Sequence, residues 1–207
     1  MILKDVKFKQ IANQKGKDVS IKEGEQIATK LFKQLSDSKD GVGLAAPQIG
    51  ILKNVCVINV KEPIALINPK IVKKSHELFT STEGCLSFPK KQVTTKRYVY
   101  IIVKADNHES KLYFSANTDS RTDDLDNTLE CACVQHEIDH LNGITMFDRE
   151  VKIEPVKTEK QYGRNEKIVI INKDKNRTQK LKWKNAKPFI DSGDWELFTW
   201  VNEIMPK

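Results

Sequence analysis

The stretch Gln135-His136-Glu137-Ile138-Asp139-His140-Leu141-Asn142-Gly143 places two histidines four positions apart in a segment with helical periodicity. With 3.6 residues per turn, such positions lie about 40° apart around a helix axis, so both imidazoles leave one face and can share a metal ion. Glu137 lies about 100° from His136, where a carboxylate is better placed to take a proton from water than to bind the ion. The sequence predicts a catalytic metal site on a helix over Thr128–Asn142 that ends at Gly143.

A pair of partly buried, hydrogen-bonded histidines is the alternative interpretation of this spacing. The glutamate directly after the first histidine and the apolar residues around the pair favour metal binding. A catalytic ion needs a third protein ligand and an open position. The long metalloprotease pattern has a histidine where this chain has Met146, which leaves Glu150 and Glu154 as weak carboxylate alternatives downstream.

Upstream, the stretch Glu83-Gly84-Cys85-Leu86-Ser87 offers a thiol on a glycine turn. Glycine lets the backbone come close to a ligand, and the residue after the cysteine can point its N–H at a substrate. A lone cysteine is more often an inert, small apolar residue. The local sequence therefore leaves two interpretations of Cys85 open, a metal ligand and a core residue.

A third stretch, Gly41-Val42-Gly43-Leu44-Ala45-Ala46-Pro47-Gln48, begins with two glycines. Their backbone N–H and C=O groups are left uncovered, so an extended peptide can pair there as an added strand. The amide of Gln48 can donate to an oxyanion. A plain turn is the alternative interpretation of a glycine pair on its own.

In their order along the chain, these three stretches closely resemble the three motifs of the peptide deformylase family, and the resemblance covers roughly residues 1–150. It implies a compact α+β fold in which antiparallel or mixed sheets pack around a central metal-binding helix. It also implies one divalent metal ion per chain, Fe²⁺ in the cell, with Zn²⁺, Ni²⁺ or Co²⁺ able to occupy the site. The implied metal ligands are Cys85, His136 and His140.

The same resemblance implies the substrate, which is the N-formylated methionine end of a newly made polypeptide, and the products, formate and a free amine. It makes Glu137 the general acid/base, and it assigns the Leu86 N–H and the Gln48 amide to the oxyanion. Motif matching places four further residues in the methionine pocket or its strand contact, with plain core packing as the alternative: Val42, Gly43, Leu129 and Cys133.

One departure from the family concerns an arginine that bacterial relatives often carry a few residues after the cysteine motif, where it contacts the substrate backbone. Here that stretch reads Phe88-Pro89-Lys90-Lys91-Gln92. The expected alternatives are that Lys90, Lys91 or Arg97 replaces the arginine, or that the contact is absent.

Residues 20–35 read as a helix that begins with a capping box formed by Ser20 and Glu23. Val- and Ile-rich segments read as strands with polar faces, which favours an antiparallel or mixed sheet and hence an α+β fold. The expected strands are 54–60, 65–72, 98–105 and 111–115, the last two forming a hairpin.

We expect residues 1–150 to form the catalytic domain and residues 151–207 to form a basic C-terminal extension, a small module with a β-hairpin and a helix. Lysine dominates residues 151–187. The elements expected in this extension are strands at 167–172 and near 181–183, a helix near 186–190 and an apolar segment at 195–201.

Composition fits a globular protein, with 39% hydrophobic and 30% charged residues. No apolar run approaches the roughly 18 residues of a membrane span, and the first five residues already carry two charges. We expect four reduced cysteines, no membrane partner and a cytoplasmic or equivalent translation compartment. The net charge of +7 fits either transient association with the ribosome through the basic surface or tail, or a solvated lysine-rich surface.

Two other functional classes compete with the deformylase hypothesis. A zinc peptidase also uses His-Glu-x-x-His, but it would cut internal peptide bonds. A nucleic-acid-binding protein with a structural metal would need a closed site, usually with four protein ligands. Cys131 or Cys133 would have to supply the fourth ligand. We expect Cys133 instead to lie beside the site, because it precedes His136 by three residues and shares its helix face.

Overall fold

The computed structural model describes residues 1–38, 41–116, 125–151, 162–172 and 177–197. The chain divides into two compact units, Met1–Val151 (unit 1) and Lys152–Lys207 (unit 2). No helix in the described ranges combines the length and apolar character that crossing a membrane requires.

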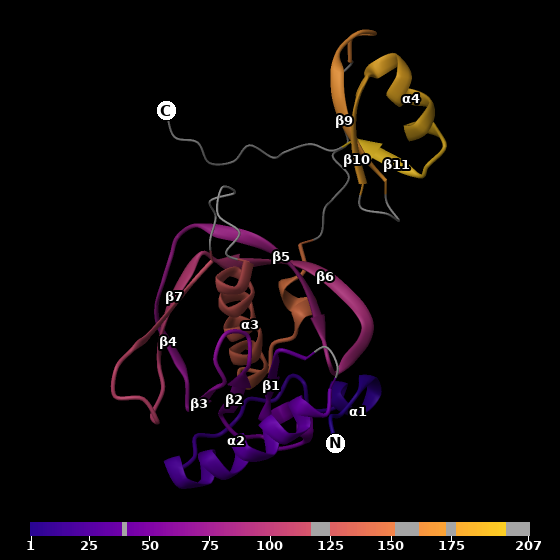
Figure 1. Ribbon diagram of the computed structural model, residues 1–207. Helices are drawn as coiled ribbons and strands as arrows, with labels where there is room; N and C mark the ends of the chain where they lie inside the picture. Colours follow the sequence, from indigo (N-terminus) through magenta and orange to yellow (C-terminus); the bar gives the residue numbers. More distant parts are fainter. Residues whose placement is uncertain (39–40, 117–124, 152–161, 173–176, 198–207) are drawn as a thin grey trace. The chain divides into compact units, whose positions relative to one another are not determined.

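Unit 1 combines helices with antiparallel sheets, which confirms the predicted α+β class (Figure 1). Three groups of strands form its sheets, in the orders β1-β2-β3, β4-β7-β8 and β5-β6. Its elements, in order, are α1 (Asp5–Lys9), α2 (Ile21–Ser36), β1 (Gly43–Ala45), the 3₁₀ helix η1 (Ala46–Ile49), β2 (Val55–Ile58), β3 (Ile64–Ile67), β4 (Lys70–Lys74), β5 (Leu78–Cys85), β6 (Phe88–Tyr98), β7 (Tyr100–Lys104), β8 (Leu112–Ser115), α3 (Leu125–Leu141) and the 3₁₀ helix η2 (Met146–Arg149).

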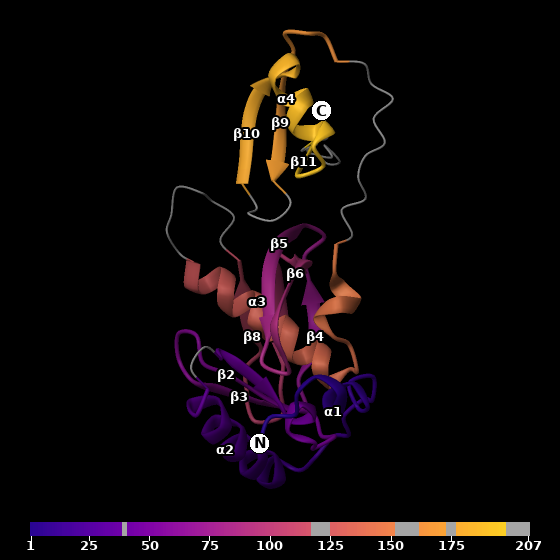
Figure 2. The ribbon, with the colours of Figure 1, turned by 90° about the vertical axis from the view of Figure 1, so that its right-hand side faces the viewer.

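Helix α3 runs through the middle of unit 1 (Figures 1 and 2). It packs against β1, β2 and β8, and its buried residues, such as Val134 and Ile138, belong to the largest apolar cluster. Because this helix is surrounded, its polar residues at 135–140 are buried as well and need partners inside the protein. The helix ends before Gly143, whose φ of 72° suits glycine, as the sequence predicts.

Helix α2 covers the β1-β2-β3 sheet with three of the four apolar residues at helical spacing that are expected to face the core; the fourth, Ile21, is 46% exposed at the start of the helix. Ile27, Leu31 and Leu35 are buried at spacings of four residues. Ser20 accepts a hydrogen bond at its Oγ from the Glu23 backbone N–H, at 3.2 Å, and so caps the first turn. Gly24 allows close approach to the sheet, because a Cβ there would lie 2.6 Å from Cγ2 of Ile67.

One strand prediction needs correction. The predicted strand at 65–72 is in fact two strands, β3 and β4, separated at Asn68, which has a φ of 51°. Asparagine tolerates this left-handed conformation, and its amide Nδ2 donates to the Val19 carbonyl (2.8 Å) and to Asp106 Oδ2 (2.7 Å). The predicted hairpin is confirmed, since β7 pairs with β8 in the register Tyr100↔Ser115.

The sequence analysis missed the long hairpin of β5 and β6. It pairs Leu78↔Tyr98 through Gly84↔Gln92. Strand β6 is rich in lysine and threonine and lacks a continuous apolar alternation, so its local pattern does not indicate a strand. Its stability comes instead from pairing and from contacts with η2.

Unit 2 is a three-stranded antiparallel sheet, in the order β10-β9-β11, with helix α4 packed against it. Among its described residues, Ile168 and Ile170 of β9 and Ala186 of α4 are buried. The predicted strand at 167–172 is confirmed, whereas the second strand and the helix both begin earlier than predicted; residues 198–201 lie outside the described ranges. The elements are β9 (Lys167–Asn172), β10 (Arg177–Lys182), α4 (Trp183–Asp191) and β11 (Trp195–Leu197).

Replacing Ser20 by alanine should lower the free energy of unfolding of unit 1 by about 1 kcal/mol, because the Glu23 N–H loses its acceptor. Ser20→Asn should restore most of the loss. Denaturant unfolding followed by circular dichroism at 222 nm measures the change. All three tryptophans lie in unit 2, so their fluorescence transition should not move. Ser36→Ala, in the last turn of α2, is the control; an equal loss there would contradict a capping role for Ser20.

Candidate metal centre

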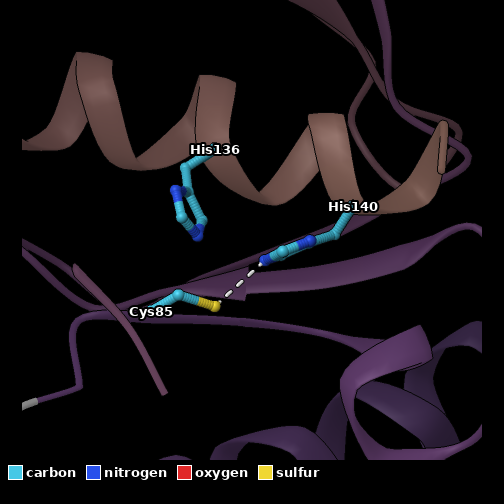
Figure 3. Close-up of side chains that lie close together, drawn as sticks. All are labelled: Cys85, His136 and His140. Carbon is cyan, nitrogen blue, oxygen red and sulfur yellow. Dashed lines mark hydrogen bonds between the residues drawn. The ribbon is translucent and has the colours of Figure 1, made fainter. Parts of the chain in front are cut away.

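The three predicted ligands come together in the interior of unit 1. Cys85 is the last residue of β5, and His136 and His140 lie on one face of α3 (Figure 3). The Cys85 Sγ lies 3.4 Å from His140 Nε2, and one donor atom from each of the three residues lies within 4.8 Å of the others. All three side chains are buried. A thiol and two imidazoles so close together are a donor set that suits a borderline-soft divalent cation.

Glu83 orients the first histidine. Its Oε2 lies 3.0 Å from His136 Nδ1, which leaves Nε2 directed toward Cys85 (Figure 3). A carboxylate on the far nitrogen is the usual outer partner of a metal-binding histidine, because it fixes the ring and its tautomer. Burial lowers the pKa of His136, but hydrogen bonds to Cys85 and Glu83 outweigh it and raise that pKa to about 10. A cation at the three donor atoms would compete with this proton.

Arg97 holds Glu83 in place. Its Nε and Nη2 donate to the two carboxylate oxygens of Glu83, at 2.6 and 2.7 Å, and its Nη1 donates to Asp139 Oδ2 at 2.5 Å. Burial raises the pKa of Glu83, but the bonds from Arg97 and His136 outweigh it and lower that pKa to about 2. Asp139 also accepts from Arg149, at 2.8 Å, so the buried charges are paired in a chain.

One expectation from the sequence is that Arg97 replaces the arginine that contacts the substrate in bacterial relatives, and this chain of ion pairs shows that alternative to be wrong. Arg97 is only 3% exposed and is committed to Glu83 and Asp139, so it does not reach the surface where a substrate would lie. Lys90 and Lys91, the other two candidates, both line the cavity in front of the metal centre.

Glu137 lies beside the three donors and is 4% exposed. Burial raises its pKa to about 7, and its Oε2 has no hydrogen-bond partner among the described residues. Gly43 allows the backbone of β1 to approach, since a Cβ there would lie 2.7 Å from Glu137 Oε1 and 2.6 Å from Cys133 Sγ. A buried carboxylate oxygen without a partner costs stability, which is a frequent feature of functional sites.

Gln48 is almost fully buried, and its amide is fixed at both ends. Its Oε1 accepts from the Ala45 N–H at 2.8 Å, while its Nε2 donates to Cys85 Sγ at 3.4 Å and to Ser87 Oγ at 3.3 Å. The carbonyl end therefore faces the backbone and the NH₂ group faces the metal centre.

A cavity of about 510 Å³ opens onto these residues. All the residues predicted to bind substrate line it: Val42, Gly43, Leu86, Leu129 and Cys133. Sequence reasoning missed Ser81, Thr82 and Ala132, which line it as well and which carry no local signal. The sulfur of Cys131 instead lies 3.7 Å from the Tyr98 carbonyl oxygen. Within the described ranges the donor cluster has three members, Cys85, His136 and His140. Neither the other cysteines nor Glu150 belong to it, and Glu154 lies outside the described ranges.

The sequence profile of polypeptide deformylases matches residues 4–156, about three quarters of the chain. The chain belongs to the polypeptide deformylase family. A peptide deformylase from Microchaete diplosiphon is 42% identical over 120 residues, which are 54% of this chain and 58% of the relative. One from Natranaerobius thermophilus is 41% identical over 128 residues, 60% of this chain and 75% of the relative. The match thus spans less than two thirds of the first relative's length.

Solved deformylase structures show the same fold. The Thermotoga maritima peptide deformylase matches with a TM-score of 0.57 and 31% identity, covering 73% of this chain and 97% of that one. Arabidopsis thaliana peptide deformylase 1B matches with a TM-score of 0.61 and 28% identity, over 73% and 81% of the two chains. These matches leave about a quarter of this chain outside the shared fold.

Replacing Arg97 by methionine should lower the free energy of unfolding of unit 1 by about 3–5 kcal/mol, because the buried carboxylates of Glu83 and Asp139 would both lose the guanidinium that they share and keep only their weaker partners, His136 and Arg149. The side chain of Arg149 is 40% exposed, and Arg149→Met should cost about 1 kcal/mol or less. Circular dichroism during denaturant unfolding measures both. Equal losses in the two variants would contradict the structural role assigned to Arg97.

Proposed function

We propose that unit 1 is a metal-dependent hydrolase that removes the N-formyl group from the N-terminal formyl-methionine of newly made polypeptides and releases formate. The observation that carries the proposal is the convergence of Cys85, His136 and His140 within 4.8 Å of one another, with Cys85, His136 and Glu137 lining a cavity of about 510 Å³. Membership of the polypeptide deformylase family supports it.

The proposal assigns one divalent ion per chain to Cys85, His136 and His140, with Fe²⁺ the ion in the cell and Zn²⁺, Ni²⁺ or Co²⁺ able to take its place. The thiolate and two imidazoles suit these borderline-soft cations better than Mg²⁺ or Ca²⁺, which prefer oxygen ligands. When bound, such an ion supplies Lewis acidity, which makes water a better nucleophile at neutral pH and polarises a carbonyl group.

Glu137 is the proposed general acid/base. Its Oε2, which has no hydrogen-bond partner in the described part of the chain, accepts a proton from the attacking water as the water oxygen adds to the formyl carbon. When the C–N bond breaks, the same oxygen passes that proton to the leaving nitrogen. One water is consumed, and formate and the free N-terminal amine are released.

Gln48 and Leu86 are the proposed donors to the oxyanion that develops on the formyl oxygen. The Gln48 amide is held with its NH₂ group toward Cys85, so it needs no reorientation during the reaction. The apolar part of the cavity would take the methionine side chain, and the substrate backbone would pair beside β1, whose Gly43 lines the cavity. The residues assigned to this contact are Val42, Gly43, Leu129 and Cys133.

The competing functions predict different products. A peptidase would cleave internal peptide bonds and release no formate. A structural metal site would need a fourth protein ligand, and the described residues offer a cluster of three donors.

Glu137→Gln should lower kcat by about 10²–10⁴-fold while the metal content stays near one ion per chain, because only the proton acceptor is removed. Cys85→Ser should lose metal affinity. Formate release from formyl-Met-Ala-Ser by protein purified anaerobically with Fe²⁺, together with metal analysis, measures both effects. Glu130→Gln, on the same helix but outside the cavity, is the matched control. A folded, metal-loaded wild type without turnover would contradict the proposed function.

We also propose that unit 2 associates transiently with the ribosome. Residues 152–207 contain thirteen Lys and Arg against eight Asp and Glu, so they carry five of the seven net positive charges. Lys167 lies directly opposite Lys182 on β10, an arrangement of like charges that costs stability unless a polyanion is near. Lys180 projects from the same face, because it lies two residues from Lys182 along the strand.

Full-length protein should co-sediment with purified ribosomes at 50 mM salt and dissociate as salt rises, because phosphate contacts release counterions. The triple variant Lys167→Glu, Lys180→Glu, Lys182→Glu should remain in the supernatant. The double variant Lys184→Glu, Lys187→Glu, whose lysines lie on α4, is the matched control. Binding by the triple variant equal to that of the wild type would contradict this surface.

A further inference from the structure

The β5–β6 hairpin is irregular directly beside the metal centre. Its pairing runs to Gly84↔Gln92 and then shifts to Cys85↔Phe88, so that three residues of β6, 89–91, face no partner on β5. One of these residues, Lys90, has a φ of 65°. Positive φ is uncommon for a residue other than glycine, because it costs conformational energy, and it persists only where the surrounding structure enforces it.

This irregularity is a β-bulge at residues 89–91, and two of its three residues are lysines that face the cavity. Lys90 and Lys91 both line the cavity that contains Glu137, and both side chains are exposed, whereas Glu137 and the three donors are buried. The lysines therefore lie at the mouth of the cavity and the reacting groups at its floor. Bulges next to active sites commonly re-aim side chains in this way.

Aromatic contacts hold Lys91 near the mouth. Its Nζ lies 5.7 Å from the centroid of the Phe147 ring, within the range of a cation–π contact. The Phe147 ring packs edge-on against Phe88, at 4.9 Å between centroids, and Phe88 itself lines the cavity. The Lys91 ammonium group therefore contacts Phe147, which in turn packs on a residue of the cavity wall, Phe88.

The two positive charges are not neutralised by the cavity's own acids. Glu83 is committed to Arg97 and His136, and Glu137 is buried beside the metal donors. Neither Lys90 nor Lys91 forms an ion pair with any residue in the described part of the chain. A substrate that leaves the cavity through its mouth therefore passes a site of unpaired positive charge.

We infer that Lys90 and Lys91 form an acid-selecting subsite, which binds the carboxylate side chain of a residue that follows the formyl-methionine in the substrate. The inference rests on the proposed function and adds a substrate class to it, nascent chains with Asp or Glu at the second or third position. The lysines contact only the part of the substrate that does not react, so their charge contributes equally to ground-state and transition-state binding. It lowers KM and leaves kcat unchanged.

The test compares peptides that are amidated at the C-terminus, so that the terminal carboxylate does not itself bind the lysines. The pairs are formyl-Met-Glu-Ser-NH₂ against formyl-Met-Gln-Ser-NH₂, and formyl-Met-Ala-Glu-NH₂ against formyl-Met-Ala-Gln-NH₂. For the wild type with Fe²⁺ we expect kcat/KM to be roughly two- to tenfold higher for glutamate in at least one pair, through KM, because each exposed ion pair contributes modestly. The ratio should approach one in 0.5 M salt.

The variants assign the effect to these lysines. Lys90→Glu with Lys91→Glu should invert the preference, and Lys90→Gln with Lys91→Gln should abolish it with less disturbance of the bulge. Lys96→Glu is the matched control, because Lys96 is an exposed lysine of β6 outside the cavity, and it should keep the wild-type ratio. Turnover of every peptide with no glutamate preference would overturn the acid-selecting subsite and leave the proposed function standing. Absence of formate release from every peptide would overturn both.

Discussion

The buried ion pairs of Arg97 connect the two parts of the chain that build the metal centre. Glu83 and Arg97 lie on β5 and β6, and Asp139 lies on α3 between the two histidines. Without the guanidinium, the buried carboxylates of Glu83 and Asp139 would lose the partner that they share, at a cost of about 3–5 kcal/mol. The pairing therefore fixes the distance between hairpin and helix, and with it the distance between Cys85 and the histidines.

The rest of the site follows from this junction. Once Glu83 is held ionised, it accepts from His136 Nδ1 and sets the direction of the ring. The close approach of β1, allowed by Gly43, places the strand against Glu137 and Cys133. Gln48 completes the wall with an amide whose two ends have different, fixed partners. His136 and Gln48 are thus each oriented by at least one neighbour outside the donor cluster, Glu83 for the ring and the Ala45 backbone for the amide.

The residues that the sequence predicted well are those whose signal is local. The spacing of His136 and His140 determines a shared helix face, and the Ser20 cap marks the start of α2 within one residue. The hairpin of β5 and β6 was missed because its stability comes from pairing and packing. The alternative in which Arg97 contacts the substrate was wrong because an arginine's partners can lie far along the chain, where no local pattern indicates them. Asp139, one of its partners, is 42 residues away. The break at Asn68 likewise depends on Asp106, which no local pattern connects to it.

The bulge in β6 places a candidate metal donor and two cavity-lining lysines within a very short piece of chain. Cys85, which contributes a donor atom, and Lys90 and Lys91, which face the cavity mouth, are separated by only a few residues of one turn. The anchoring pairs of this hairpin, Glu83 and Arg97, lie outside the turn and are buried. Natural variation can therefore rewrite residues 89–91, in charge or in length, while the anchors keep the sulfur in position. A change in this turn would then alter which side chains face the cavity and leave the buried anchors of Cys85 where they are.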